Sequence, residues 1–269
     1  MDHSGDLIEA VAGSLRTSGV HLLSAAELTR AIGVTGGSWA AFGAHWDELR
    51  PDRYAAELGT RRLRRYGHFA FRAADGTLER LPHESFVQPQ GSNRLYLDRD
   101  RRFEPLTERF ACDPVLRAVI RLLGRLAQSL DDVSTWHVKV TPFRVVATTD
   151  SHGDPTPEGV HRDGVTLVSA LLIGRRNADG GESSVYDTGG HLLLATTLTE
   201  PGTLLVGDDR RTLHGVTAIR PVDPMRPAHR DVLVVTFAHD RSCPDPGGAG
   251  AVGSSGRTRT STRRRRSEP

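Results

Sequence analysis

The sequence predicts a mainly β protein, an antiparallel barrel or jelly roll with helices packed against it. Residues 134–240 contain short runs rich in Val, Leu and Thr, and each run is bounded by Gly, Pro or Asp. No helical pattern separates these runs, which argues against a parallel α/β sheet. A helical rhythm is confined to the part of the chain before residue 130.

The helices are expected in the N-terminal half. Residues 6–32 have apolar side chains at helical spacing, interrupted by Ser18 and Gly19, and predict two short helices. Residues 113–130 predict the clearest helix, because Asp113 is a capping residue, Pro114 stands in the first turn and apolar residues then recur on one face.

The strands are expected after that helix, and Pro142 is expected to split the first of them. Their ranges are 136–149, 165–173, 182–187, 191–198, 203–206, 213–220 and 230–238. We therefore expect a single domain over residues 1–242, with a helical part over about 1–130 and a jelly-roll core over about 134–240.

Residues 243–269 differ in composition from the rest of the chain. They hold six Arg against Asp245 and Glu268, whereas the net charge of all 269 residues is only +2. With almost nothing apolar to bury, this tail is expected to be disordered and dispensable. No aromatic residues alternate with its arginines, so we expect no nucleic-acid partner.

The chain shows no membrane or export signal. No apolar run approaches the roughly 20 residues that a spanning helix needs, and the first residues lack a basic start with an apolar core. We expect a cytoplasmic protein without a membrane partner.

His161, Asp163 and His214 are the candidate metal ligands. His161 and Asp163 lie two apart between the second and third expected strands, so both can point to one side of an extended segment. His214 lies on the seventh strand, which can approach that turn at the mouth of a roll. Two imidazoles and one carboxylate leave positions open and suit non-haem Fe(II), whereas zinc prefers a tetrahedral set. An isolated H-x-D is also typical of a surface turn with a capping Asp.

Arg230 is the candidate anchor for a co-substrate. An oxoacid that chelates iron through its keto and carboxylate oxygens has a distal carboxylate, which an arginine can hold by two hydrogen bonds. Arg230 opens the last strand, and Val232, Val234 and Thr236 are expected to face the same way. Arg220, directly before Pro221, is the competitor and fits a solvated strand end.

The sequence resembles the bacterial 2-oxoglutarate/Fe(II)-dependent dioxygenases of the L-isoleucine dioxygenase type, which act on free amino acids. The resemblance covers roughly residues 50–240. The segments that carry it are His161-Arg162-Asp163-Gly164-Val165, Gly180-Gly181-Glu182-Ser183, Val185-Tyr186-Asp187, Leu213-His214-Gly215-Val216 and Arg230-Asp231-Val232-Leu233, with Tyr54, Arg61, Arg62, Arg64, Arg65, Tyr66, Gln88 and Asn93 upstream.

The resemblance implies a double-stranded β-helix with Fe(II) on His161, Asp163 and His214, and 2-oxoglutarate on Arg230. It implies an oxidoreductase that uses O2, with ascorbate added in vitro, and converts 2-oxoglutarate to succinate and CO2 while it oxidises an unactivated C–H bond. The substrate would be a free L-amino acid, proteinogenic or nonproteinogenic, of specialised metabolism such as antibiotic biosynthesis. Hydroxylation, desaturation, ring closure and cyclopropanation all stay open.

The remaining contacts are expectations of the same kind. Many relatives have a hydroxyl two residues after the anchoring Arg, where this chain has Val232, so Thr236 or Thr166 is the candidate for the second 2-oxoglutarate contact. Glu182 is the candidate for the substrate ammonium group, and Gln88 and Asn93 are candidate substrate contacts from a loop.

Two questions remain open at this stage. The cluster Arg61, Arg62, Arg64 and Arg65 is expected to be mostly solvated, with one member able to reach a substrate carboxylate. The alternatives in function are an oxygenase of protein or RNA, a non-enzymatic metal-binding sensor and a zinc hydrolase. The oligomeric state is also open, with a homodimer as one alternative.

Overall fold

The computed structural model describes residues 3–84 and 101–239. The chain divides into two units, residues 1–239 and residues 240–269, and all the elements described below belong to the first. The expected boundary at 242 and the tail 243–269 lie outside the described residues, so both stay predictions. None of the described helices is long and apolar enough to cross a membrane.

A nine-stranded, antiparallel sheet forms the body of the unit. Its central strands are β11 (Leu204–Asp208), β7 (Leu167–Arg176), β14 (Ala228–Ala238) and β6 (Thr135–Ala147), in that order. The N-terminal half adds β1 (Val20–Leu23) beside β11, and beside β6 it adds β2 (Arg50–Pro51), β3 (Arg61–Arg64), β4 (Gly67–Arg72) and β5 (Leu78–Arg80).

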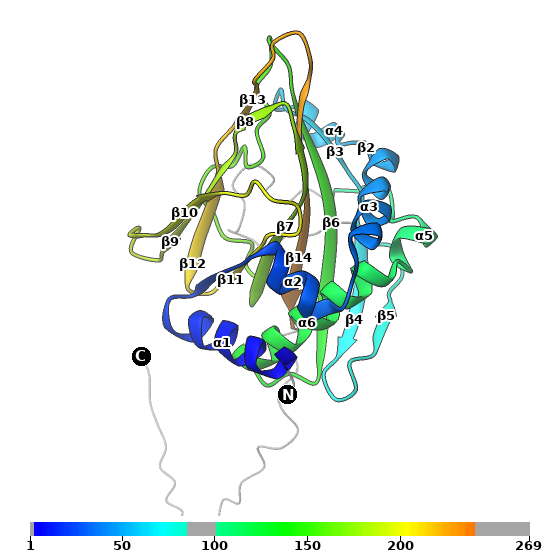
Figure 1. Ribbon diagram of the computed structural model, residues 1–269, viewed down its shortest axis with the longest axis vertical. Helices are drawn as coiled ribbons and strands as arrows, with labels where there is room; N and C mark the ends of the chain where they lie inside the picture. Colours follow the sequence, from blue (N-terminus) through cyan, green and yellow to red (C-terminus); the bar gives the residue numbers. More distant parts are fainter. Residues whose placement is uncertain (1–2, 85–100, 240–269) are drawn as a thin grey trace, which may run out of the picture. The chain divides into compact units, whose positions relative to one another are not determined.

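A smaller sheet lies beside the large one and completes the roll (Figure 1). It has the order β10 (Leu192–Thr197), β9 (Glu182–Asp187) and β12 (Thr212–Val216). A short pair, β8 (Ala178–Gly180) and β13 (Ile219–Pro221), follows at one end. The predicted jelly roll is confirmed.

The alternation along β14 separates the helix-covered core from the interior of the roll. Leu233, Val235 and Phe237 are buried in the main hydrophobic cluster together with residues of α6. The intervening side chains, Arg230, Val232, Val234 and Thr236, line the cavity, as the period of a strand requires.

The helices cover the other face of the large sheet. They are α1 (His3–Thr17), α2 (Ala25–Ile32), α3 (Gly36–Gly43), the 3₁₀ turn η1 (Ala44–Glu48), α4 (Arg53–Ala56), α5 (Glu108–Ala111) and α6 (Pro114–Leu130). Helix α6 begins as predicted: the Asp113 carboxylate accepts a hydrogen bond from the Val115 N–H, and Pro114 occupies the first turn.

Two local expectations were wrong. The segment Val20–Leu23 is an edge strand paired with Leu204–Gly207 rather than the start of a helix. Pro142 does not split β6, because it lies between the stretches that pair with β3 (residues 143–146) and β4 (residues 135–140). No neighbouring strand needs a donor from Pro142 in that gap, so a proline is tolerated inside a long strand.

Candidate functional site

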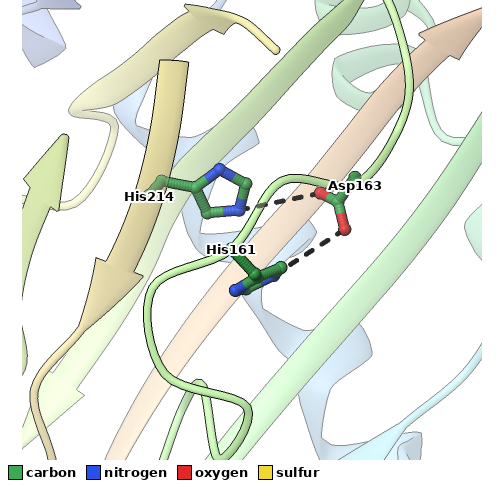
Figure 2. A group of neighbouring side chains, drawn as sticks. All are labelled: His161, Asp163 and His214. Atoms are coloured by element: carbon green, nitrogen blue, oxygen red, sulfur yellow. Dashed lines mark ion pairs between the residues drawn. The ribbon is translucent and has the colours of Figure 1, made fainter. Parts of the chain in front are cut away.

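His161, Asp163 and His214 come together inside the roll (Figure 2). One potential ligand atom from each of them lies within 4.8 Å of the others. The distance from His161 Nε2 to Asp163 Oδ1 is 3.9 Å, and that from His214 Nε2 to Asp163 Oδ2 is 3.7 Å. The three candidate ligands therefore surround one point, which a single metal ion can occupy.

Backbone pairing places the two histidines. The His161 N–H donates to the His214 carbonyl at 2.9 Å, and the His214 N–H donates back at 2.8 Å. Residues that exchange both hydrogen bonds in an antiparallel pair present their side chains on one face. In addition, His161 Nδ1 donates to the Gly159 carbonyl at 2.9 Å, which leaves the lone pair of Nε2 available to a metal ion.

Asp209 holds the turn that carries Asp163. Its carboxylate accepts hydrogen bonds from the N–H groups of Asp163, Gly164 and Val165 at 3.0, 2.7 and 3.0 Å. Gly164 has a φ of +76°, a left-handed conformation that favours glycine and lets the three donors converge. Asp209 Oδ1 also lies 3.8 Å from His214 Nδ1, so this one buried carboxylate touches the turn and approaches a ligand ring.

Electrostatics favours the metal-binding forms. Burial lowers the pKa of His214; the Asp163 carboxylate opposes this shift and His161 adds to it, so the net effect favours the neutral imidazole with its free lone pair. Burial raises the pKa of Asp209, and the nearby Asp163 carboxylate raises it further. A cation between His161, Asp163 and His214 would offset that repulsion.

Arg230 lies at the start of β14 and is only 3% exposed. Its Nε and Nη2 atoms are buried and have no hydrogen-bond partner among the described residues. Burial lowers its pKa to about 10, and Arg175 contributes, yet the guanidinium remains charged at neutral pH. An unpaired buried cation is costly, so this group fits an anionic ligand such as the distal carboxylate of an oxoacid.

A cavity of about 230 Å³ connects the candidate ligands with Arg230. Glu158 lines it beside the metal site, with Oε1 at 3.6 Å from His161 Nε2. Arg62, Arg64 and Arg101 line it as well. The cavity thus has one carboxylate next to the ligand set and a group of guanidinium side chains in the same space.

Three arginines in and directly after β3 are a correction to the sequence prediction, whereas Arg61 is exposed as expected. Arg62, Arg64 and Arg65 are buried, not solvated. The Arg62 Nε donates to Asp52 at 3.0 Å, and the Arg64 guanidinium lies over the Phe103 ring at 3.5 Å from its centroid. The Asp52 carboxylate and the faces of aromatic rings stabilise these buried guanidinium groups, which the sequence pattern had predicted to be in contact with water.

The other predicted contacts are distributed differently. Thr236 lines the cavity but lies six residues from Arg230 on the same strand, about 20 Å away at the rise of a strand. Thr166 and Arg220 are not among the cavity-lining residues, and Arg220 is exposed. Glu182 is also exposed and outside that lining. Gln88 and Asn93 lie outside the described residues.

Comparisons with known proteins agree with this geometry. The family model described as 2OG-Fe dioxygenase matches residues 43–236. No curated protein matches the chain. Among solved structures, a bsmA homolog from Methylobium petroleophilum PM1 is 35% identical, with a TM-score of 0.80 over 86% of this chain and 92% of that chain.

Two further solved structures share the fold at lower identity. The protein named IDO from Bacillus thuringiensis is 18% identical, with a TM-score of 0.71 over 87% of this chain and 96% of that chain. The Fe(II)/α-ketoglutarate-dependent dioxygenase TqaL is also 18% identical, with a TM-score of 0.70 over 87% of both chains.

Proposed function

The chain belongs to the 2OG-Fe dioxygenase family, and on that premise we propose that it oxidises an unactivated C–H bond of a free L-amino acid. Enzymes of this family use Fe(II), 2-oxoglutarate and O2, so the protein is a 2-oxoglutarate-dependent non-haem iron dioxygenase. The amino acid as substrate is the step that this proposal adds.

The residues present fit the family's cofactors. Two neutral imidazoles and one carboxylate are a donor set for Fe(II) that leaves positions open for a co-substrate and O2. The unpaired, buried nitrogens of Arg230 fit the distal carboxylate of 2-oxoglutarate. When bound, the iron supplies the oxidising chemistry, which couples decarboxylation of 2-oxoglutarate to succinate with oxidation of the substrate.

The side chains of the protein position the metal, the co-substrate and the substrate. His161, Asp163 and His214 fix the place of the metal, and Arg230 fixes the far end of the co-substrate. The apolar side chains of Val232 and Val234 line the cavity and limit the water in it. Orientation then decides which substrate carbon reacts, because a misplacement of about 1 Å changes rates about 100-fold.

The observation that supports an amino acid is the pairing of opposite charges in one small cavity. Glu158 beside the metal site suits an ammonium group, and the guanidinium group of Arg62 or Arg64 suits a carboxylate. A cavity of about 230 Å³ is small for a ligand site, and this favours a small substrate. Glu158 takes the role that the sequence had suggested for Glu182. Nonproteinogenic amino acids of specialised metabolism, including antibiotic biosynthesis, belong to the same substrate class.

The test is succinate formation by the purified protein with Fe(II), ascorbate, 2-oxoglutarate and air, in the presence of pools of free amino acids. Mass spectrometry then identifies the product, either by the gain of one oxygen atom or by the loss of two hydrogen atoms. Each active amino acid is compared with its analogues that lack the amino group or the carboxylate. We expect both analogues to be poor substrates.

One control variant and two contradicting outcomes make the result specific. The His214→Ala variant should fold but lose both turnover and the visible absorption of the Fe(II)–2-oxoglutarate complex formed without O2. If the wild-type protein forms that complex yet no amino acid raises succinate above background, the amino acid proposal is wrong. Equal turnover of the deaminated analogues would contradict it as well.

A further inference from the structure

A second arginine lies next to Arg230. The register of β14 on β7 pairs Arg230 directly with Arg175. Directly opposed residues of antiparallel strands present their side chains on the same face. Arg230 lines the cavity, whereas Arg175 is not among the lining residues and lies beside Arg230 on the same face of the sheet.

The Arg175 guanidinium has one nitrogen that is hydrogen-bonded and one that is buried without a partner among the described residues. Its Nη2 donates to the carbonyl oxygens of Ala178 and Gly180 at 2.9 and 2.8 Å, which fixes the group against β8. Its Nη1 is buried and has no hydrogen-bond partner in the described part of the chain. Together with Nε and Nη2 of Arg230, three buried guanidinium nitrogens therefore lack an acceptor.

Both side chains meet at Gly181. A Cβ atom at this position would lie 3.2 Å from Arg175 Nη1 and 3.3 Å from Arg230 Cδ. Gly181 also has a φ of +72°, where a side chain is strained. The same Cβ would lie 2.9 Å from Ile219 Cγ2, so both arginine side chains pack closely against the Gly181 backbone, which only a residue without a side chain allows.

The buried Arg230 and the partly buried Arg175 place two positive charges side by side, which an anion would stabilise. Arg175 contributes to the lowered pKa of Arg230, after burial, which is the expected effect of like charges. Burial lowers the pKa of Arg175, and Asp179 opposes this effect only in part; Asp179 is exposed and forms no ion pair with Arg175 among the described residues. Within residues 3–84 and 101–239 no other carboxylate acts on either arginine, so a ligand is the source of compensating charge that these residues leave.

The usual second donor is missing from β14 itself. Val232, two residues after Arg230, is apolar and has no hydrogen-bonding group in its side chain. Thr236 is too far along the strand to reach the same carboxylate. A donor from the neighbouring strand β7 is therefore the geometric substitute.

On the basis of the proposed function, we propose that Arg175 is a second anchor for the distal carboxylate of 2-oxoglutarate. In this arrangement Nη1 of Arg175 and the Nε and Nη2 atoms of Arg230 donate to the two oxygens of that carboxylate. The role is binding and orientation of the co-substrate, and it is specific for an oxoacid with a second carboxylate.

The experiment measures binding rather than turnover. The full-length protein, loaded with Mn(II) in the absence of O2, is titrated calorimetrically with 2-oxoglutarate and with 2-oxovalerate, which has the same carbon chain without the distal carboxylate. We expect Arg175→Gln to raise the Kd for 2-oxoglutarate by about 10- to 100-fold. The Kd for 2-oxovalerate should remain unchanged.

The controls separate binding from folding. Arg176→Gln removes the next, exposed arginine of β7 and should change neither constant. Arg230→Gln should weaken binding of 2-oxoglutarate alone. Arg175→Lys keeps the charge, so a smaller loss is expected, and it replaces Arg175→Gln if that variant fails to fold.

Two outcomes overturn the inference while the proposed function stands. In the first, Arg175→Gln binds 2-oxoglutarate as the wild type does. In the second, it weakens 2-oxoglutarate and 2-oxovalerate equally, which would reveal a purely structural role through Ala178 and Gly180. If the wild-type protein itself fails to discriminate the two oxoacids, the proposed function fails with the inference.

Discussion

Asp209 supports the candidate metal site without being one of its candidate ligands. The turn from Asp163 to Val165 has no strand partner for its N–H groups, and the Asp209 carboxylate accepts all three of them. Hydrogen bonds to an ionised acceptor are about twice as strong as neutral ones. They hold Asp163 in place before any metal binds, and this lowers the entropy that binding would otherwise cost.

Asp209→Asn should therefore weaken metal binding more than it weakens the fold. Asparagine keeps one acceptor oxygen but turns an amide N–H₂ toward the backbone donors, so the turn loses its fixed shape. We expect the Kd for Mn(II) to rise about 10- to 100-fold, the effect typical of outer-shell partners. Electron paramagnetic resonance of free Mn(II) during a titration measures this constant.

The preceding residue provides a matched control. Asp208 is equally buried, but its carboxylate accepts from the Arg210 side chain instead of the ligand turn. Asp208→Asn should lower the thermal midpoint and leave the Mn(II) constant within about twofold of the wild-type value. Equal weakening of Mn(II) binding in both variants would refute the specific role of Asp209.

At the scale of single residues, the sequence predicted features that depend on local spacing, but it did not predict contacts between residues far apart in the chain. H-x-D placed two ligands on one turn because its geometry depends on only three residues. Asp209 is 46 residues from Asp163 in sequence, and Arg175 meets Arg230 only through the register of two strands. Glu158, three residues before His161, is the one missed residue for which a local signal existed, a carboxylate on the same loop.

Among the elements, the sequence pattern predicted helix α6 and strand β9, and it missed the short strands of the N-terminal half. Helix α6 has many turns of apolar spacing, and β9 was predicted with its observed ends. Strands β1 to β5 contain between 2 and 6 residues, and most of their partners are far away in sequence. Such segments are too short for a period, so the tertiary contacts of β6 and β11 decide their conformation.

Helix α6 offers a prediction in which packing opposes propensity. Alanine is a better helix former than glycine by about 1 kcal/mol, so Gly124→Ala alone would be expected to stabilise the helix. However, a Cβ at Gly124 would lie 2.5 Å from atoms of the buried Phe71 ring. We expect the clash to cost about 1–3 kcal/mol and the variant to unfold at lower urea concentration.

The same substitution in α1 is the control. Gly13 has no atom within 4 Å of its Cβ position, so Gly13→Ala should stabilise the protein by about 0.5–1 kcal/mol. Combining Gly124→Ala with Phe71→Leu should recover part of the loss, since the ring is then absent. Stabilisation by Gly124→Ala would show that helix α6 does not press against β4 as closely as the structure indicates.

Several strands of the unit carry partly buried histidines outside the candidate metal site. Burial lowers the pKa of His21 on β1, His68 on β4 and His229 on β14. For His68, the nearby His137 and Lys139 lower it further. Each of these groups is neutral in the folded protein at pH values where the unfolded chain already binds a proton. The free energy of unfolding therefore depends on pH through the entire roll and not only through the metal site.

The direction of this dependence can be predicted. Because the unfolded histidine binds a proton near pH 6.5 and the folded one does so only at lower pH, stability is fully present above about pH 6.5 and falls as the pH is lowered through it. Urea unfolding of the metal-free protein between about pH 7.5 and about pH 5.5 measures the slope. His68→Gln removes one of these groups, so its profile should be flatter than that of the wild type over the same range. Parallel profiles would mean that His68 is protonated equally in the folded and unfolded protein, and that its position between β4 and β6 does not exclude the charge.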